Sequence, residues 1–156
     1  MSSEMGHVVR RAFDELWSQG RLETADEIFA SNYTNHDPAS PNFGQGPAAE
    51  KQMVALYRRS FPDLQLTIDL MIEAGDFVTA RFSAQGTHKN EFRGIAPTNR
   101  TVRVEGTAVY LILGGRIAER WAVWDALGLM QQLGVVAGLE ARAQAGNLAL
   151  PGSPGA

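Results

Sequence analysis

The sequence contains no cysteine, so disulfide bonds, thiolate nucleophiles and cysteine-ligated metal centres are excluded. Long hydrophobic runs are missing as well. The longest is Ala108–Leu113, far shorter than the roughly 20 residues that cross a bilayer. Residues 1–11 also lack the apolar stretch of a secretory signal. We therefore expect a cytoplasmic protein that has no membrane partner.

An excess of positive charge is absent too. The chain carries 14 Lys and Arg against 17 Asp and Glu, a formal net charge of −3, and these charges are scattered. Proteins that bind nucleic acid usually show a basic face or stripe. We therefore do not expect a nucleic-acid partner.

What the chain does have is enough apolar material for one globular domain. Hydrophobic residues make up 44% of its 156 residues. We predict a single domain over residues 1–134. Residues 135–156 are rich in Ala and Gly, and we predict a C-terminal tail there that is partly helical or disordered.

Helical spacing dominates the first part of the chain. Three helices are predicted there, over residues 8–17, 22–29 and 47–60. Gly20 is a suitable stop for the first of them, and Pro47 suits the first turn of the third. Between the second and third helices, a polar segment that ends at Pro38 favours a short strand at residues 33–36.

The second half of the chain has the alternation of β-strands. Four strands are predicted, over residues 64–72, 77–88, 101–113 and 116–125, with a further helix over residues 127–133. In the first strand, Leu64, Leu66, Ile68, Leu70 and Ile72 alternate with polar residues, which predicts one buried face. Helices followed by strands indicate the α+β class. We expect a cone-shaped α+β barrel, with the N-terminal helices packed on a curved antiparallel sheet and one open mouth.

Several short motifs stand in a fixed order along the chain. They are residues 15–17, 33–38, 61–64, 86–88, 92–98, 121–125 and 127–134. With this order and spacing the chain resembles the SnoaL-like polyketide cyclase family, within the nuclear transport factor 2-like fold group. The resemblance implies a cone-shaped fold and cofactor-free ring closure of a polyketide by intramolecular aldol condensation.

Asp125 is the first candidate for catalysis. On a two-residue period it shares a face with Glu119, Trp121 and Val123. If that face points into the cone, Asp125 lies in an apolar pocket that suits its carboxyl to proton transfer. The resemblance implies that an aspartate of the last strand is the general acid/base. The alternative is that Asp125 only caps the helix that begins at Ala126.

His36 is the second catalytic candidate. In the pocket it would polarise a substrate carbonyl or hold the carboxyl of Asp125, and the resemblance supports a pocket position. The alternative is an exposed histidine beside a turn led by Asn35 or Asp37. A further set of side chains is predicted to bind the substrate: Trp17, Tyr33, Met53, Tyr57, His88, Tyr110 and Trp121. For each aromatic member of this set, a place in the core is the alternative.

Bound cofactors are not expected. The histidines and carboxylates form no spacing typical of a metal site, and no glycine-rich loop follows a strand as in a dinucleotide site. We therefore predict no metal and no cofactor. Catalysis would use carboxylate and imidazole groups in a pocket that takes an apolar or aromatic small molecule.

Two other functions remain open at this stage. One is a non-catalytic binding domain of the same fold, with a closed or purely apolar pocket and Asp125 as a helix cap. The other is a hydratase, an epoxide hydrolase or a cofactor-free oxygenase on this scaffold. Epoxide hydrolysis would need two carboxylates and an arginine, such as Asp125 and Glu119 with Arg81 or Arg103.

The outer face of the sheet gives one more expectation. Strands such as residues 102–113 place apolar side chains on it as well as on the inner face. Such a face is usually covered, and a second copy of the chain is the simplest cover. We predict a homodimer.

Overall fold

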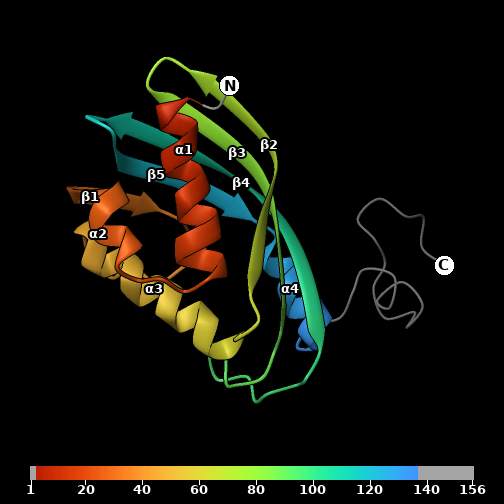
Figure 1. The fold of residues 1–156 in the computed structure, drawn as a ribbon. Coiled ribbons are helices and arrows are strands. Elements are labelled where there is room, and N and C mark those ends of the chain that lie inside the picture. Colours follow the sequence, from red (N-terminus) through yellow and green to blue (C-terminus); the bar gives the residue numbers. More distant parts are fainter. Residues whose placement is uncertain (1–2, 137–156) are drawn as a thin grey trace, which may run out of the picture.

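The computed structural model describes residues 3–136. It is an α+β fold, as predicted, in which helices lie on the concave side of one curved sheet (Figure 1). The sheet has five strands in the order β1-β5-β4-β3-β2. Of the predicted tail, residues 137–156 lie outside the described part of the chain.

The N-terminal helices follow the predicted spacing closely. Helix α1 (Glu4–Arg11) is capped by the side chain of Ser3 and continues into a π-helical segment, η1 (Ala12–Ser18). Gly20, at φ +73°, then turns the chain. Helix α2 (Thr24–Ile28) is shorter than its predicted range, and α3 (Gly46–Ser60) matches its prediction, with proline in its first turn.

Four strands form the predicted antiparallel meander. They are β2 (Gln65–Ala74), β3 (Phe77–Thr87), β4 (Thr101–Leu113) and β5 (Arg116–Trp124). Strand β1 (Phe29–His36) is longer than predicted and pairs in parallel with β5. Because of this pairing, the residues that follow β1 lie beside the C-terminal end of β5. Helix α4 (Ala126–Leu133) follows β5 directly and ends at Gly134 in the left-handed conformation.

The core lies between the helices and the inner face of the sheet. Phe13 of η1 packs edge-on against Phe82 of β3 and Tyr110 of β4. A second cluster, around Phe61 and Phe92, closes the end of the sheet near α4. These two clusters hold the inner faces of β3, β4 and β5 against the helices, so inward-facing side chains there are buried.

One prediction about a strand face is wrong, and a condition stated for a second strand is not met. In β2 the register shifts between Ile68 and Leu70, so Leu70 and Ile72 lie on the outer face rather than continuing the buried one. In β5 the inward residues are Arg120, Ala122 and Trp124. The face shared by Glu119, Trp121, Val123 and Asp125 is therefore the outer one; Val123 is 71% exposed.

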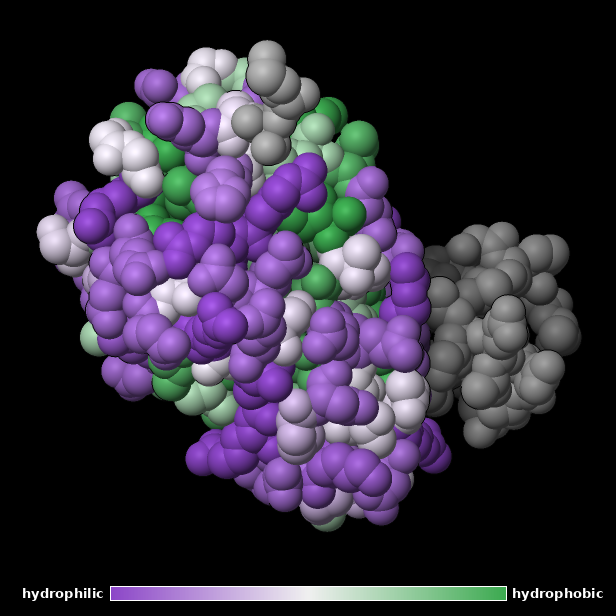
Figure 2. All heavy atoms as spheres, in the orientation of Figure 1, coloured by the Kyte–Doolittle hydropathy of each residue, from purple (hydrophilic) through white to green (hydrophobic). Residues whose placement is uncertain are grey.

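The outer sheet face carries several exposed apolar side chains. They are Leu70, Ile72, Phe77, Leu113, Trp121 and Val123. Figure 2, seen from the helix side, shows a mostly hydrophilic surface with hydrophobic side chains gathered near the upper part of the sheet. Among the described residues, no helix is long and apolar enough to cross a membrane.

Candidate functional site

A cavity opens between α3, the inner face of the sheet and α4. Its volume is about 80 Å³, several times the roughly 10–15 Å³ that one water molecule needs. Its walls are mainly apolar, with polar groups at one end. Its lining includes Trp17, Tyr57, Phe61, Leu66, Phe82, Val104 and Leu129, together with Asp37, Ser40, Arg120 and Trp124.

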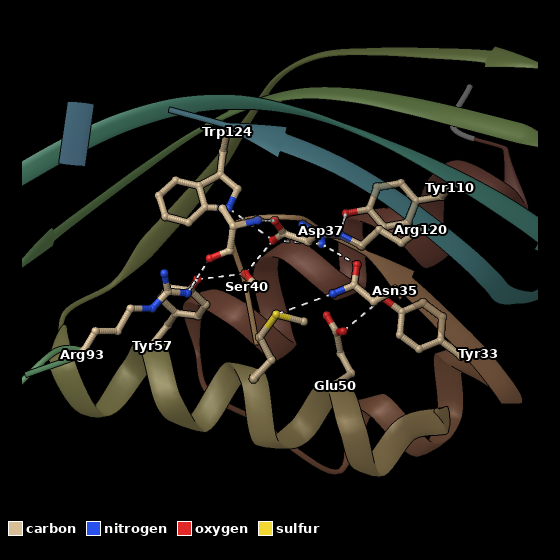
Figure 3. A network of polar contacts seen from close by, with 12 residues as sticks. Tyr33, Asn35, Asp37, Ser40, Glu50, Tyr57, Arg93, Tyr110, Arg120 and Trp124 are labelled. Atoms are coloured by element: carbon tan, nitrogen blue, oxygen red, sulfur yellow. Dashed lines mark hydrogen bonds and ion pairs between the residues drawn. The ribbon is translucent and has the colours of Figure 1, made fainter. Parts of the chain in front are cut away.

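Asp37 is the carboxylate of this cavity. It directly follows β1, and only 3% of its side chain is exposed. Oδ1 accepts the backbone N–H of Ala39 at 2.9 Å, and Oδ2 accepts the hydroxyl of Ser40 at 2.6 Å and the indole N–H of Trp124 at 3.2 Å (Figure 3). Pro38 ends the strand, and the bond to Ala39 forms an Asx turn that fixes the carboxylate at the cavity wall.

Arg120 brings the opposite charge to the same place. It comes from the inner face of β5, is 6% exposed, and lies 3.9 Å from Oδ2 of Asp37. It donates to the side-chain oxygen of Asn35 at 3.0 Å and to the hydroxyl of Tyr110 at 3.5 Å. Burial lowers the pKa of Arg120, but its interactions with Tyr110 and Tyr33 outweigh burial and keep that pKa above its ordinary value. The guanidinium is a permanent buried cation.

A chain of hydroxyls extends the site toward the loop between β3 and β4. Ser40 and Tyr57 hydroxyls lie 2.8 Å apart, and Arg93 donates to the Tyr57 oxygen at 3.1 Å. Arg93 has φ +49°, a left-handed backbone conformation that turns the loop so that Phe92 packs on Tyr57. Burial raises the pKa of Tyr57, so its hydroxyl stays neutral and can donate a hydrogen bond.

The tryptophan at the end of β5 depends on a glycine in the neighbouring strand. Gly106 lies opposite Trp124 in the β4–β5 pairing. A Cβ at Gly106 would lie 2.7 Å from the Cβ of Trp124, closer than real Cβ contacts. The glycine therefore leaves the space in which the indole reaches Asp37.

Asp125 lies outside the cavity. It is exposed, and its Oδ1 accepts the backbone N–H of Gly128 at 2.8 Å, which makes it the N-cap of α4. Its fit to that turn is close, since a Cβ at Gly128 would lie 2.1 Å from Oδ2 of Asp125. Of the two alternatives for Asp125, the structure places the residue as a helix cap on the outer side of the sheet.

His36 also lies on the outer side. Its Nε2 is 3.0 Å from Oε2 of Glu119, and its ring stacks on Trp121 with the centroids 5.3 Å apart. The structure therefore brings neither His36 nor Asp125 to the cavity, and they form no hydrogen bond with each other there. The structure matches the alternative for His36, an exposed histidine beside a turn led by Asp37. His36 also lines the second cavity, described below.

The predicted substrate-binding side chains divide into four groups. Trp17 and Tyr57 line the cavity. Tyr33 and Met53 line a second cavity, described below. Tyr110 is in the core, where it contacts Arg120, and His88 is fully buried at the base of the loop, 3.0 Å from the hydroxyl of Thr98. Trp121 is on the outer face.

Sequence reasoning missed Asp37 and Arg120 as members of the site. Asp37 belongs to the motif at residues 33–38, but the sequence indicated for it only a place at the start of a turn. The structure contains that turn. Parity places Arg120 on the face of β5 opposite to Glu119 and Trp121, so Arg120 could have been found if the inward face were known. What the sequence could not supply was the direction in which β5 faces.

The family of the chain follows from a comparison with known protein families. Residues 7–133 match the SnoaL-like polyketide cyclase family. The chain belongs to this family, and its fold is the one that the family's solved structures share. No curated protein matches the chain.

Several solved structures are similar to this chain. A candidate polyketide cyclase from Acidithiobacillus ferrooxidans is 32% identical, with a TM-score of 0.80 over 88% of this chain and 99% of that one. IdmH, a candidate polyketide cyclase from Streptomyces antibioticus, is 27% identical, with a TM-score of 0.73 over 85% of this chain and 99% of that one. AclR, a candidate hydroxylase from Streptomyces galilaeus, is 21% identical, with a TM-score of 0.74 over 85% and 97% of the two chains. The last similarity concerns the fold alone, and the fold by itself does not decide the reaction.

Proposed function

We propose that this protein is a cofactor-independent cyclase that closes a ring in a polyketide-like small molecule by an intramolecular aldol reaction. The observation that carries the proposal is Asp37, a buried carboxylate at the polar end of an otherwise apolar cavity. The apolar walls of this small cavity suit an apolar or aromatic group of the substrate. Membership of the SnoaL-like family supports the same class of reaction.

In the proposed reaction Asp37 is the general base. Its carboxylate takes a proton from the carbon between two carbonyl groups, so that the C–H bond breaks and an O–H bond forms on Asp37. The resulting enolate attacks a second carbonyl of the same molecule, which forms the new carbon–carbon bond. The alkoxide then takes the proton back from Asp37, so no proton is gained or lost overall.

The groups around Asp37 have separate tasks in this scheme. Ser40, Trp124 and the backbone of Ala39 fix the orientation of the carboxylate. Arg120 supplies positive charge beside the developing enolate. The neutral hydroxyl of Tyr57 donates to Ser40, whose own proton goes to Asp37, so Tyr57 supports the orientation of the carboxylate. The apolar walls keep water away from the enolate.

A second function has one observation in its favour. A non-catalytic binding domain would use Asp125 as a helix cap, and Asp125 caps α4. The same reading expects a purely apolar pocket, whereas this cavity holds a buried ion pair between Asp37 and Arg120. We therefore prefer the enzyme. A cytoplasmic location and a homodimer formed through the exposed outer sheet face accompany the proposal.

The test measures the first chemical step directly. Ethyl benzoylacetate, an aromatic β-keto ester, is incubated with the protein in D₂O, and loss of the α-proton signal is followed by NMR. Wild-type protein should speed exchange above the buffer rate, and Asp37→Asn should lower the protein-dependent rate by about 10²–10⁴-fold. Asp125→Asn is the matched control and should retain exchange.

Two outcomes would count against the enzyme. Exchange that is unchanged in Asp37→Asn removes Asp37 from the reaction. Binding of the ester without any exchange above buffer, seen as shifted resonances of cavity residues, supports the binding domain instead.

A further inference from the structure

Glu50 is a buried carboxyl that the proposed reaction does not use. It projects from α3 into the polar network of Figure 3 and is 1% exposed. Its Oε2 accepts the hydroxyl of Tyr33 at 3.0 Å. Its other oxygen, Oε1, has no hydrogen-bond partner among residues 3–136. A buried carboxylate oxygen left without a partner is costly, so this position calls for an explanation.

A second cavity lies beside Glu50. It has a volume of about 370 Å³ and lies between the end of β1, the loop that follows it, and α3. Glu50 lines this cavity together with polar side chains such as Asn35 and Asn42. Its lining is more polar than that of the first cavity, and a space of this size can hold ordered water beside Glu50.

The two cavities share a wall. Asp37 and Ser40 line both of them, whereas Glu50 lines only the second. Asp37 therefore lies between an apolar cavity on one side and a more polar cavity, lined by a second carboxyl, on the other.

Polar or charged groups from five parts of the chain face Glu50. They are Trp17 of η1, Tyr33 of β1, Asp37 in the loop after β1, Tyr110 of β4 and Arg120 of β5. Burial raises the pKa of Glu50, and Arg120 opposes this only in part. Arg120 is the only cation of this set and faces two carboxyls. When both are ionised, the buried cluster holds a net negative charge, which is unfavourable.

We propose that Glu50 is a second titrating carboxyl of the site, which exchanges its proton with water in the second cavity and sets how readily Asp37 accepts one. The catalytic consequence rests on the proposed function, but the titration itself does not. Glu50 is a positioning residue, because it does not line the cavity proposed for the substrate.

The linkage works through the shared cation. While Glu50 is protonated, Arg120 is the counter-ion of Asp37 alone. When the O–H bond of Glu50 breaks, its proton passes to water and its carboxylate shares Arg120. Proton uptake by Asp37 is then more favourable, because the charge around it is more negative.

The first experiment follows Glu50 itself. The side-chain carboxyl carbons of ¹³C-labelled glutamates are titrated by NMR, and the Glu50 signal is assigned by its loss in Glu50→Gln. Its midpoint should lie above 4.5, the ordinary value for glutamate. The midpoint should fall in Asp37→Asn, since one negative neighbour is gone. It should stay unchanged in Glu23→Gln, whose glutamate is exposed in the turn before α2. A midpoint at or below 4.5, or one that Asp37→Asn leaves in place, would overturn the proposal.

The second experiment tests the catalytic consequence. The pH profile of α-proton exchange in ethyl benzoylacetate should show two ionisations in wild-type protein and in Glu23→Gln, but one in Glu50→Gln. A Glu50→Gln profile identical to that of wild type contradicts the linkage. If wild-type protein shows no exchange at all, the proposed function has failed, and the NMR titration still decides whether Glu50 and Asp37 are coupled.

Discussion

The buried ion pair makes a strong prediction about stability. Replacing Arg120 by methionine keeps much of the side-chain volume but removes the cation that, among residues 3–136, faces Asp37 and Glu50. Arg120 is 6% exposed, so water has little access to the position of its guanidinium. Two carboxyls then remain buried without a counter-ion.

The expected cost is large for a domain of this size. Breaking a buried pair by removing one partner costs about 3–5 kcal/mol, whereas an exposed pair contributes about 0–1 kcal/mol. Arg120→Met also leaves the side-chain oxygen of Asn35 without its donor, which adds about 1–3 kcal/mol. We expect a loss of at least about 3 kcal/mol in the free energy of unfolding, a large share of the 5–15 kcal/mol typical of such domains.

Urea unfolding followed by circular dichroism measures this loss. The triple variant Arg120→Met, Asp37→Asn, Glu50→Gln is the control. It removes both carboxylates with the cation and should recover part of the stability. A loss below about 1 kcal/mol in Arg120→Met, with an unchanged dependence on urea, would refute a buried pair. So would a triple variant less stable than Arg120→Met, because the carboxylates would then not be the source of the cost.

Three further predictions concern single residues. Asp125→Ala should lower the free energy of unfolding by about 1 kcal/mol, as expected for an N-cap, and leave proton exchange intact; lost exchange in a folded variant would return Asp125 to the site. The pKa of Glu50 is raised in the fold, so the stability it contributes is full below 4.5 and is lost as pH rises through the folded pKa. The urea midpoint of Glu50→Gln should therefore increase relative to that of wild type as pH rises above 4.5. A difference between the two midpoints that does not change with pH would contradict this. Trp121→Glu places a charge in the exposed outer sheet face and should convert the homodimer to a monomer, as measured by light scattering. Wild-type protein that is monomeric at micromolar concentration would refute the homodimer.

The sequence predicted the elements well because their patterns are local. The strand at residues 101–113 is found with its predicted bounds, and the hairpin at Gly114 and Gly115 leads into β5. Glycines and prolines mark where the chain turns, and apolar spacing marks helix or strand within a few residues. Neither signal depends on what the segment later packs against.

The site could not be predicted in the same way, because it depends on which face of a strand is buried. Alternation placed Glu119 and Asp125 on one face of β5 and Arg120 on the other, which is right. Both faces of this strand are apolar enough to be buried, since Trp121 and Val123 lie on one and Ala122 and Trp124 on the other. The parallel pairing of β1 with β5 brings Asp37 to the inner face of the sheet, where Arg120 also lies. Because these two segments are far apart in the chain, their contact leaves no local signal in the sequence.

The central claim is that chemistry takes place at Asp37, on the inner side of the sheet. A crystal structure of the Asp37→Asn variant with bound ethyl benzoylacetate tests it most directly. We predict the ester in the cavity lined by Trp17, Tyr57 and Trp124, with its α-carbon about 3–3.5 Å from the side chain at position 37. An ester bound instead on the outer face, beside His36, Trp121 and Asp125, would contradict the account.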